Sequence, residues 1–179
     1  MAPVALYNAD PSQFSSDDLE GLLSQIRSTS YIDEVTSGET SAEDSGLWEV
    51  VLVLPSELLI AGKDGFKFEA DGSLNDTSIQ KIAAYIRDEV AKTSSSVEKT
   101  GESQWSAAAV VIADQRTKKD GSLLLVEIDH LKKAGVVMDK VRVVPRSVIE
   151  IACNVEVANM SLSEFKSMSH DADVFDSGH

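Results

Sequence analysis

The strongest periodic pattern in the sequence lies near its carboxyl end and predicts a half-buried β-strand over 149–157. The odd positions of this segment are apolar and read Ile149, Ile151, Cys153, Val155 and Val157. Alternation with a period of two is typical of a strand that covers a core with one face only. A weaker alternation over 140–143 predicts a partner strand, joined by a three-residue loop at 145–147. We therefore expect an antiparallel hairpin here.

Short apolar segments elsewhere predict the remaining strands. They are 48–54, 58–61, 66–69, 107–113 and 123–128. Glycine-containing turns precede or join several of them and favour hairpins. Helices are indicated where a capping residue precedes apolar positions at helical spacing, near Ser15, Thr77 and Ser161. The sequence therefore predicts an α+β fold, with a largely antiparallel sheet of six to seven hairpin-linked strands and two to three helices packed on it.

The chain is expected to form a single globular unit with two acidic extensions. Residues 28–46 are polar, acidic and aperiodic, as in a long loop or flexible linker. We therefore divide the chain into an amino-terminal helix and acidic arm (1–46), one α+β domain (47–168) and an acidic tail (169–179). The tail has no periodicity, so it is expected to be disordered unless another chain holds it.

The composition narrows the possible partners. The chain carries 30 acidic and 16 basic side chains, for a formal net charge of −14. Such a surface repels phosphate groups, which disfavours direct binding to nucleic acid or to an anionic membrane. No segment approaches the roughly 18 consecutive apolar residues of a membrane-spanning helix, and no secretory signal is recognisable. With a single cysteine, Cys153, the expectation is a cytoplasmic protein without a disulfide.

Charge is unevenly distributed along the chain. Residues 1–50 hold ten acidic side chains and one basic one, whereas residues 116–146 hold eight basic and four acidic ones. Because surfaces of opposite charge steer proteins together, we expect a protein partner or self-association. The candidate interaction residues are Trp48, Trp105, Arg116, Lys118, Lys119, Lys132, Lys133, Asp171, Asp173 and Asp176.

Candidate catalytic residues gather around the predicted hairpin of 107–128. Asp114 ends the first strand, while Glu127 and Asp129 share a face at the end of the second. Carboxylates in register can hold a divalent cation, and their order is similar to the Asp, then Glu-x-Lys pattern of metal-dependent nucleases, with Asp129 in place of the lysine. His130 beside Asp129 can serve as a general base. Acidic side chains on an edge strand also deter aggregation, which explains the same residues without catalysis.

Sequence signatures of cofactor binding are missing. There is no phosphate-binding glycine loop, no zinc-ligand spacing and no calcium-binding loop, so no cofactor, metal or small-molecule substrate is predicted. We therefore expect a non-catalytic interaction or assembly subunit, homo-oligomeric, whose acidic arms (28–46 and 170–179) make the contacts. Two alternatives remain: a metal-dependent hydrolase or nuclease-like enzyme around Asp114, Glu127 and Asp129, and an acidic inhibitor that mimics a polyanion.

Overall fold

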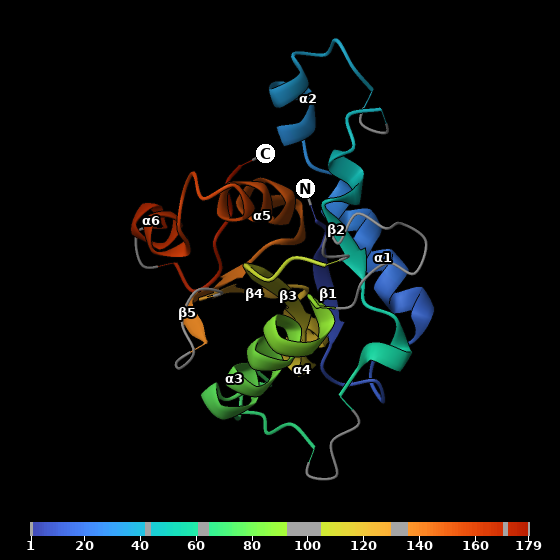
Figure 1. Cartoon of the computed structure of the whole chain (residues 1–179), viewed down its shortest axis with the longest axis vertical. Helices are drawn as coiled ribbons and strands as arrows, with labels where there is room; N and C mark the ends of the chain where they lie inside the picture. Colours follow the sequence, from blue (N-terminus) through green and yellow to red (C-terminus); the bar gives the residue numbers. More distant parts are fainter. Residues whose placement is uncertain are drawn as a thin grey trace.

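A mixed sheet of five strands organises the molecule (Figure 1). The computed structural model describes residues 2–41, 44–60, 65–92, 105–129, 136–169 and 172–178. The strands are β1 (Val4–Asn8), β2 (Val51–Val53), β3 (Ala109–Ala113), β4 (Leu123–Ile128) and β5 (Val137–Val143). Their order across the sheet is β2-β1-β3-β4-β5.

The sheet combines a parallel half and an antiparallel half. β1 runs parallel to both β2 and β3, whereas β3, β4 and β5 are successively antiparallel. Every residue of β1 and β3 is buried. Parallel strands that are covered on both faces have continuous apolar sequences, which accounts for the run at Ala109–Ala113.

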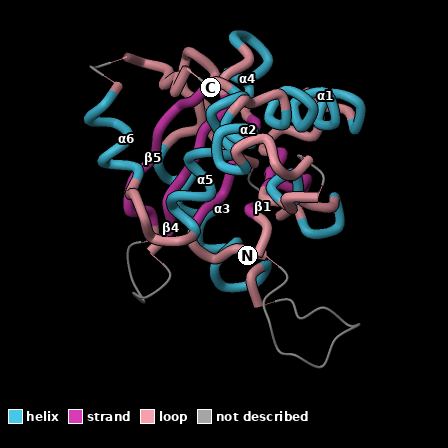
Figure 2. Tube along the Cα trace, turned by 90° about the horizontal axis from the view of Figure 1, so that it is seen from above, coloured by secondary structure: helices cyan, strands magenta, loops and turns pink. Residues whose placement is uncertain are grey.

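Helices cover both faces of the sheet (Figure 1). Their bounds are α1 (Ser16–Arg27), α2 (Tyr31–Thr36), α3 (Asp76–Tyr85, continued by a π-helical turn to Val90), α4 (Gln115–Asp120), α5 (Val148–Glu156) and α6 (Leu162–Met168). α1 and α5 pack with one face of the sheet, and α3 packs with the other. α6 lies beside β5 (Figure 2).

Local capping signals correctly predict two helix starts. The Ser15 hydroxyl accepts the backbone N–H of Asp18, and the Asp18 carboxylate accepts the backbone N–H of Ser15. Ser161 and Glu164 form the same reciprocal pair at α6. α3 differs slightly, because Asn75 caps it in place of Thr77. Such caps bond within one helical turn, so neighbouring residues suffice to specify them.

The predicted antiparallel character of the sheet is only partly right. The α+β class and the antiparallel pairing of β3 with β4 are confirmed, but the sheet has five strands, and β1 makes two parallel pairs. The predicted strand at 140–143 lies in β5, which pairs with β4 and not with the segment at 149–157. Parallel neighbours need a crossover connection, which α1 supplies between β1 and β2, and α3 between β2 and β3. The predicted hairpin of 58–61 with 66–69 is not formed by the described residues, since Phe68 instead bridges Leu74. Residues 61–64 lie outside the described residues.

The predicted strand over 149–157 is wrong, because this segment forms α5. Pro145 begins a 3-10 turn (Pro145–Ser147) that leads directly into the helix. α5 packs against β3, α1 and α6, so it is buried on several sides and needs little polar surface. Its buried residues Val148, Ile151, Ala152 and Val155 follow helical spacing, which the alternation of odd positions concealed.

The predicted boundary at residue 46 needs correction as well. β1 lies inside the sheet with no exposed surface over Val4–Tyr7, so the amino-terminal segment belongs to the core. Part of the expected acidic linker is helical, as α2. The described part of the tail, residues 172–178, lies against the body of the same chain.

Candidate functional site

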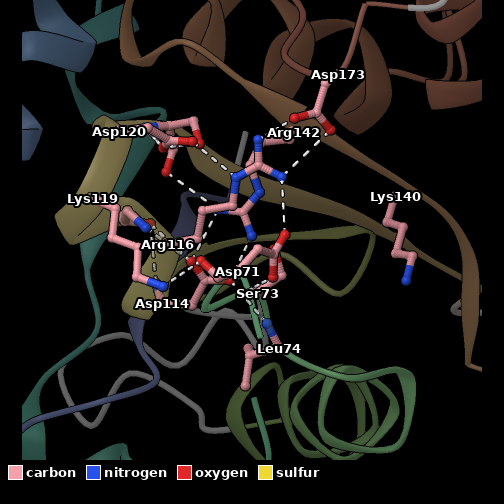
Figure 3. Close-up of polar contacts among 12 residues, drawn as sticks. Asp71, Ser73, Leu74, Asp114, Arg116, Lys119, Asp120, Lys140, Arg142 and Asp173 are labelled. Atoms are coloured by element: carbon pink, nitrogen blue, oxygen red, sulfur yellow. Dashed lines mark hydrogen bonds and ion pairs between the residues drawn. The ribbon is translucent and has the colours of Figure 1, made fainter. Parts of the chain in front are cut away.

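A buried ion pair lies at the carboxyl end of β3 (Figure 3). The carboxylate of Asp114, which is fully buried, accepts bonds from Nη1 and Nη2 of Arg142 at 3.0 and 2.5 Å. Arg142 stands on β5 opposite Leu124 of β4, so its side chain spans β4 to reach β3. The carboxylate also accepts the backbone N–H groups of Leu74 and Thr117, each at 3.1 Å. This arrangement, the Asp114 hub, joins two strands, a turn and α4.

Arg116, beside the Asp114 hub, forms ion pairs with three carboxylates. Its Nε donates to Asp120 at 2.9 Å, its Nη1 lies 3.4 Å from Asp71, and it also pairs with Asp173. The backbone N–H of Arg116 donates to the carbonyl of Gly72 at 3.0 Å, so the turn of residues 71–74 is bound to α4 by main-chain and side-chain contacts. Three segments that are distant in sequence therefore meet at one guanidinium.

Hydrogen bonds keep these exposed groups ionised. Bonds with Asp173 and then Asp120 raise the pKa of the Arg116 guanidinium. Bonds from the backbone and hydroxyl of Ser73 hold the pKa of Asp71 below its ordinary value. Partial burial acts to raise the pKa of Asp120, but bonds from Ser122 and Arg116 outweigh it and lower that pKa. Arg116, Asp71 and Asp120 therefore carry their full charges at neutral pH, although salt weakens ion pairs at the surface.

Residues 172–178, here termed the C-terminal strap, extend the sheet beyond β5. The backbone N–H of Phe175 donates to the carbonyl of Arg142 at 2.7 Å. The backbone N–H of Val144 donates to the carbonyl of Phe175 at 3.0 Å, so Phe175 forms a parallel bridge with Val143. The strap thus uses the edge of β5 as a sixth strand would.

Side chains hold the strap on both sides of this bridge. The ring of Phe175 is buried and meets Phe165 of α6 edge-on, with centroids 5.9 Å apart. Nε of Arg146 donates to Asp176 at 3.1 Å, and this pair lowers the pKa of Asp176. The hydroxyl of Ser147 accepts the backbone N–H of Ser177 at 2.9 Å. Together with the Arg116–Asp173 pair, these contacts define both a position and a direction for an extended acidic segment.

The predicted catalytic carboxylates do not converge. Glu127 pairs with Ala109, five residues before Asp114, which places about 16 Å of strand between the two acids. Glu127 accepts the backbone N–H of Leu162 at the start of α6 instead. Asp129 is buried near the end of β4, where its charge adds to the larger effect of the hydrogen bond with Asp88 in raising the pKa of Arg87. His130 lies outside the described residues. Within the described part of the chain, no three His, Cys, Asp or Glu side chains form a metal-binding group.

Several predicted interaction residues contact their own chain. Arg116 pairs with Asp173, and Asp176 with Arg146. Lys118 Nζ lies 2.7 Å from Asp18 and 5.1 Å from the ring centroid of Phe14.

The remaining predicted interaction residues are a lysine, two tryptophans and three residues outside the described ranges. Lys119 donates to the carbonyl of Asp71 at 2.7 Å. Trp105 is buried, and the guanidinium of Arg27 lies 5.7 Å from the ring centroid of Trp48. Lys132, Lys133 and Asp171 lie outside the described residues.

Sequence reasoning missed Arg142, Arg146 and Phe175. The alternation of β5 placed Arg142 on its polar face, where a solvated side chain is the ordinary expectation. A signal for Phe175 was present, because it is the one aromatic residue in the acidic tail and an apolar anchor needs a surface to cover it. Its docking site is built from β5 and α6. The sequence indicates a strand at 140–143 and a helix near Ser161, but only the fold shows that the two elements meet.

Two further expectations concern the reactivity of Cys153 and the absence of membrane-spanning helices. Cys153 is buried, and this burial raises the pKa of its thiol to about 11, as expected for an unreactive core cysteine. Across the described ranges, the helices are too short or too polar to span a lipid bilayer.

Comparisons with known proteins place the chain in one family. A family model described as "Domain of unknown function (DUF6924)" matches residues 39–177. No curated protein and no solved structure matches the chain.

Proposed function

Since this chain belongs to the DUF6924 family, whose function is unknown, we propose its role from its own geometry: it is a non-catalytic interaction domain that binds an extended acidic protein segment along the edge of β5. One observation carries the proposal. The C-terminal strap occupies this edge with backbone bonds, a buried aromatic anchor and two arginine–aspartate pairs. A segment of the same chemistry from another protein can use the same contacts.

The backbone bonds supply affinity that is independent of sequence. In strand addition, an extended segment pairs with an exposed sheet edge, and its main chain satisfies the unpaired N–H and C=O groups there. Phe175 makes one bond in each direction with Arg142 and Val144. Any extended residue except proline, which lacks the backbone N–H, can make these two bonds, so they favour binding with little selection of a partner.

The side chains supply specificity. Arg116 pairs with the acid two residues before the aromatic anchor, and Arg146 pairs with the acid that follows it directly. The anchor itself packs edge-on against Phe165, an arrangement that stabilises aromatic pairs beyond their buried area. The site therefore favours the order acid, any residue, aromatic, acid, which the chain itself has at 173–176.

Because the chain's own strap occupies the edge of β5, an external segment needs a minimum affinity to displace it. A tethered segment has an effective concentration in the millimolar range when its linker is short. An external segment must exceed the affinity of the strap by making further contacts, or it binds when the strap has been released. The strap is thus both a cover for the edge of β5 and a competitor for it.

A displaced strap provides the test. The substitution Phe175→Ala in the full chain removes the anchor and opens the edge of β5. A fluorescent peptide with the sequence of residues 170–179 should then bind the variant and raise its anisotropy, and should bind the unaltered chain far more weakly. Adding Arg146→Ala to the Phe175→Ala chain should weaken peptide binding, because the peptide's acid after the aromatic loses its partner.

A peptide with alanine in place of the aromatic residue is the matched control and should not bind. Circular dichroism establishes that each variant remains folded. If the folded Phe175→Ala chain does not bind the native peptide, the strap only covers an edge strand, and the proposal is wrong.

A further inference from the structure

A second candidate site lies away from the strap, where β1 and β2 end. A cavity of about 410 Å³ opens between the connection from β1 to α1 and the residues that follow β2. In open α/β sheets, ligands bind outside the carboxyl ends of the strands, and this cavity lies at that end of β1 and β2. The volume lies within the range of roughly 300–1,000 Å³ that is typical of small-molecule sites.

The floor of the cavity is apolar and preformed. Phe14 and Leu54 line it, with exposed fractions of 6% and 2%. The carbonyl of Phe14 accepts the side-chain N–H of Asn8 at 3.4 Å, and the backbone N–H of Leu54 donates to the carbonyl of Leu6 at 2.9 Å, so each residue is bonded to β1. The ring of Phe14 already has one cation near it, Lys118 Nζ at 5.1 Å from the centroid. An apolar body therefore has a rigid surface to cover.

The polar side chains that line the cavity are two carboxylates, two hydroxyls and one amide, and each of them offers a hydrogen-bond acceptor. The side-chain N–H group of Asn8, which is buried, donates to the carbonyl of Phe14 at 3.4 Å. Its Oδ1 accepts the backbone N–H of Asp10 at 3.1 Å and keeps a second lone pair. Glu20 of α1 and Glu57, which follows β2, add two carboxylates. Among the described residues that line the cavity, none is basic.

From this combination we infer that the cavity binds a small organic cation, namely a protonated amine attached to an apolar body. The ammonium group donates hydrogen bonds to the acceptors and is neutralised by Glu20 and Glu57, while the apolar body covers Phe14 and Leu54. An anionic ligand is disfavoured because it meets two carboxylates, and Lys118, which lies near the Phe14 ring but not in the cavity lining, is already paired with Asp18. This inference is independent of the strap, which lies on the opposite edge strand of the sheet.

The test uses the full chain and a matched pair of probes. Phenethylammonium has the inferred chemistry, and 2-phenylethanol has the same ring without the charge. Isothermal titration at low ionic strength should show saturable binding of phenethylammonium and much weaker binding of 2-phenylethanol. Raising the salt concentration should weaken the binding of phenethylammonium, because the carboxylates are exposed.

Three single variants and one double variant locate the binding. Glu20→Gln and Glu57→Gln should each weaken the affinity for phenethylammonium about two- to fivefold, the effect of one exposed ion pair. Glu39→Gln removes the same charge from an exposed position outside the cavity lining and should leave the affinity unchanged. Three results overturn the inference: no saturable binding of phenethylammonium, equal binding of the uncharged probe, or equal affinity in the double variant Glu20→Gln/Glu57→Gln and in Glu39→Gln. The inference is supported only if phenethylammonium binds more tightly than 2-phenylethanol and if this preference decreases in the cavity variants.

Discussion

Single residues at the carboxyl end of β3 combine charge, burial and backbone geometry. Asp114 is fully buried and Arg142 nearly so, and each satisfies the other's charge. Removing one partner of such a pair costs about 3–5 kcal/mol of stability, because an unpaired charge remains buried. The neighbouring pairs of Arg116 are more exposed, and each is worth about 0–1 kcal/mol. Loss of one member of the buried pair should therefore destabilise the protein far more than loss of any single exposed pair of Arg116.

Gly72 offers a direct test of the close approach between the turn of residues 71–74 and α4. Its φ is +94°, and a Cβ atom there would lie 2.9 Å from the backbone nitrogen of Arg116. Gly72→Ala should lower the free energy of unfolding by about 1–3 kcal/mol, because the substitution combines backbone strain with a collision that main-chain atoms cannot avoid. Urea-induced unfolding, followed by circular dichroism, measures the change.

Gly21 is the matched control for that substitution. It lies in α1, and a Cβ atom there would meet nothing within 4 Å. Gly21→Ala should raise the free energy of unfolding by about 0.5–1 kcal/mol, since alanine is the better helix residue. If Gly72→Ala were as harmless as Gly21→Ala, the turn would not approach α4 as closely as described.

At the scale of elements, each helix depends on how its ends are satisfied and on what covers its sides. α1 and α6 begin at reciprocal side-chain caps, which neighbouring residues provide. α5 has no side-chain cap at its first residue, and it is specified by packing against β3, α1 and α6. The cap of α1 also connects to α4, because Lys118 pairs with Asp18. This pair makes the first turn of α1 sensitive to pH.

The carboxylate of Asp18 should show this sensitivity. Bonds from Lys118, and then from Ser15, lower the pKa of Asp18 from its ordinary value of 3.8 to about 2. A lowered pKa means that the folded protein favours the ionised form. The stability that Asp18 contributes is therefore complete above about pH 4 and is lost as the pH falls through 2.

Carbon-detected NMR of the Asp18 carboxyl group tests the prediction directly. The titration midpoint should lie near pH 2 in the unaltered chain and move toward 3.8 in Lys118→Ala, with Lys166→Ala as a control that leaves Asp18 untouched. A midpoint near 3.8 in the unaltered chain would show that the reciprocal cap and the ion pair do not persist in solution.

At the scale of the whole molecule, the central position of β1 decides what counts as the domain. The family match covers residues 39–177, yet β1 and α1 precede that range. β1 joins β2 to β3 through parallel pairs on both of its edges. Without it, β2 has no partner among the described strands, and the hydrophobic cores on the two faces of the sheet each lose buried residues. The amino-terminal segment is therefore structural.

Deleting residues 1–8 should consequently prevent cooperative folding. The chain would lose the strand that connects the parallel half of the sheet to the antiparallel half. Amide-proton dispersion in NMR spectra and the loss of a cooperative urea transition measure this outcome. Deletion of residues 170–179 is the contrasting variant, and it should leave a folded protein, because the strap adds to an edge that the sheet already has. Cooperative unfolding of the chain that lacks residues 1–8 would contradict the central role of β1.

The sequence alone determined those features that depend on near neighbours. The caps at Ser15 and Ser161 act within one helical turn. The apolar segments at 109–113 and 123–128 form buried strands, as their local sequences predict. The acidic surface and the core position of Cys153 follow from composition and local hydrophobicity.

Only the tertiary structure decided which segments meet. Parallel pairing of β1 joins residues about 50 to 100 positions apart, and no local pattern specifies such a partner. The segment at 149–157 alternates as a strand would, but neighbours on several sides bury it as a helix and so remove the need for a polar face. Arg142 on β5 reaches Asp114 at the end of β3 because the sheet places only β4 between these two strands. Phe175 reaches Phe165 because its segment pairs with the outer edge of β5, beside α6. Contacts between segments that are distant in sequence bury these residues, and local periodicity does not encode such contacts. They therefore determine both the fold and the site.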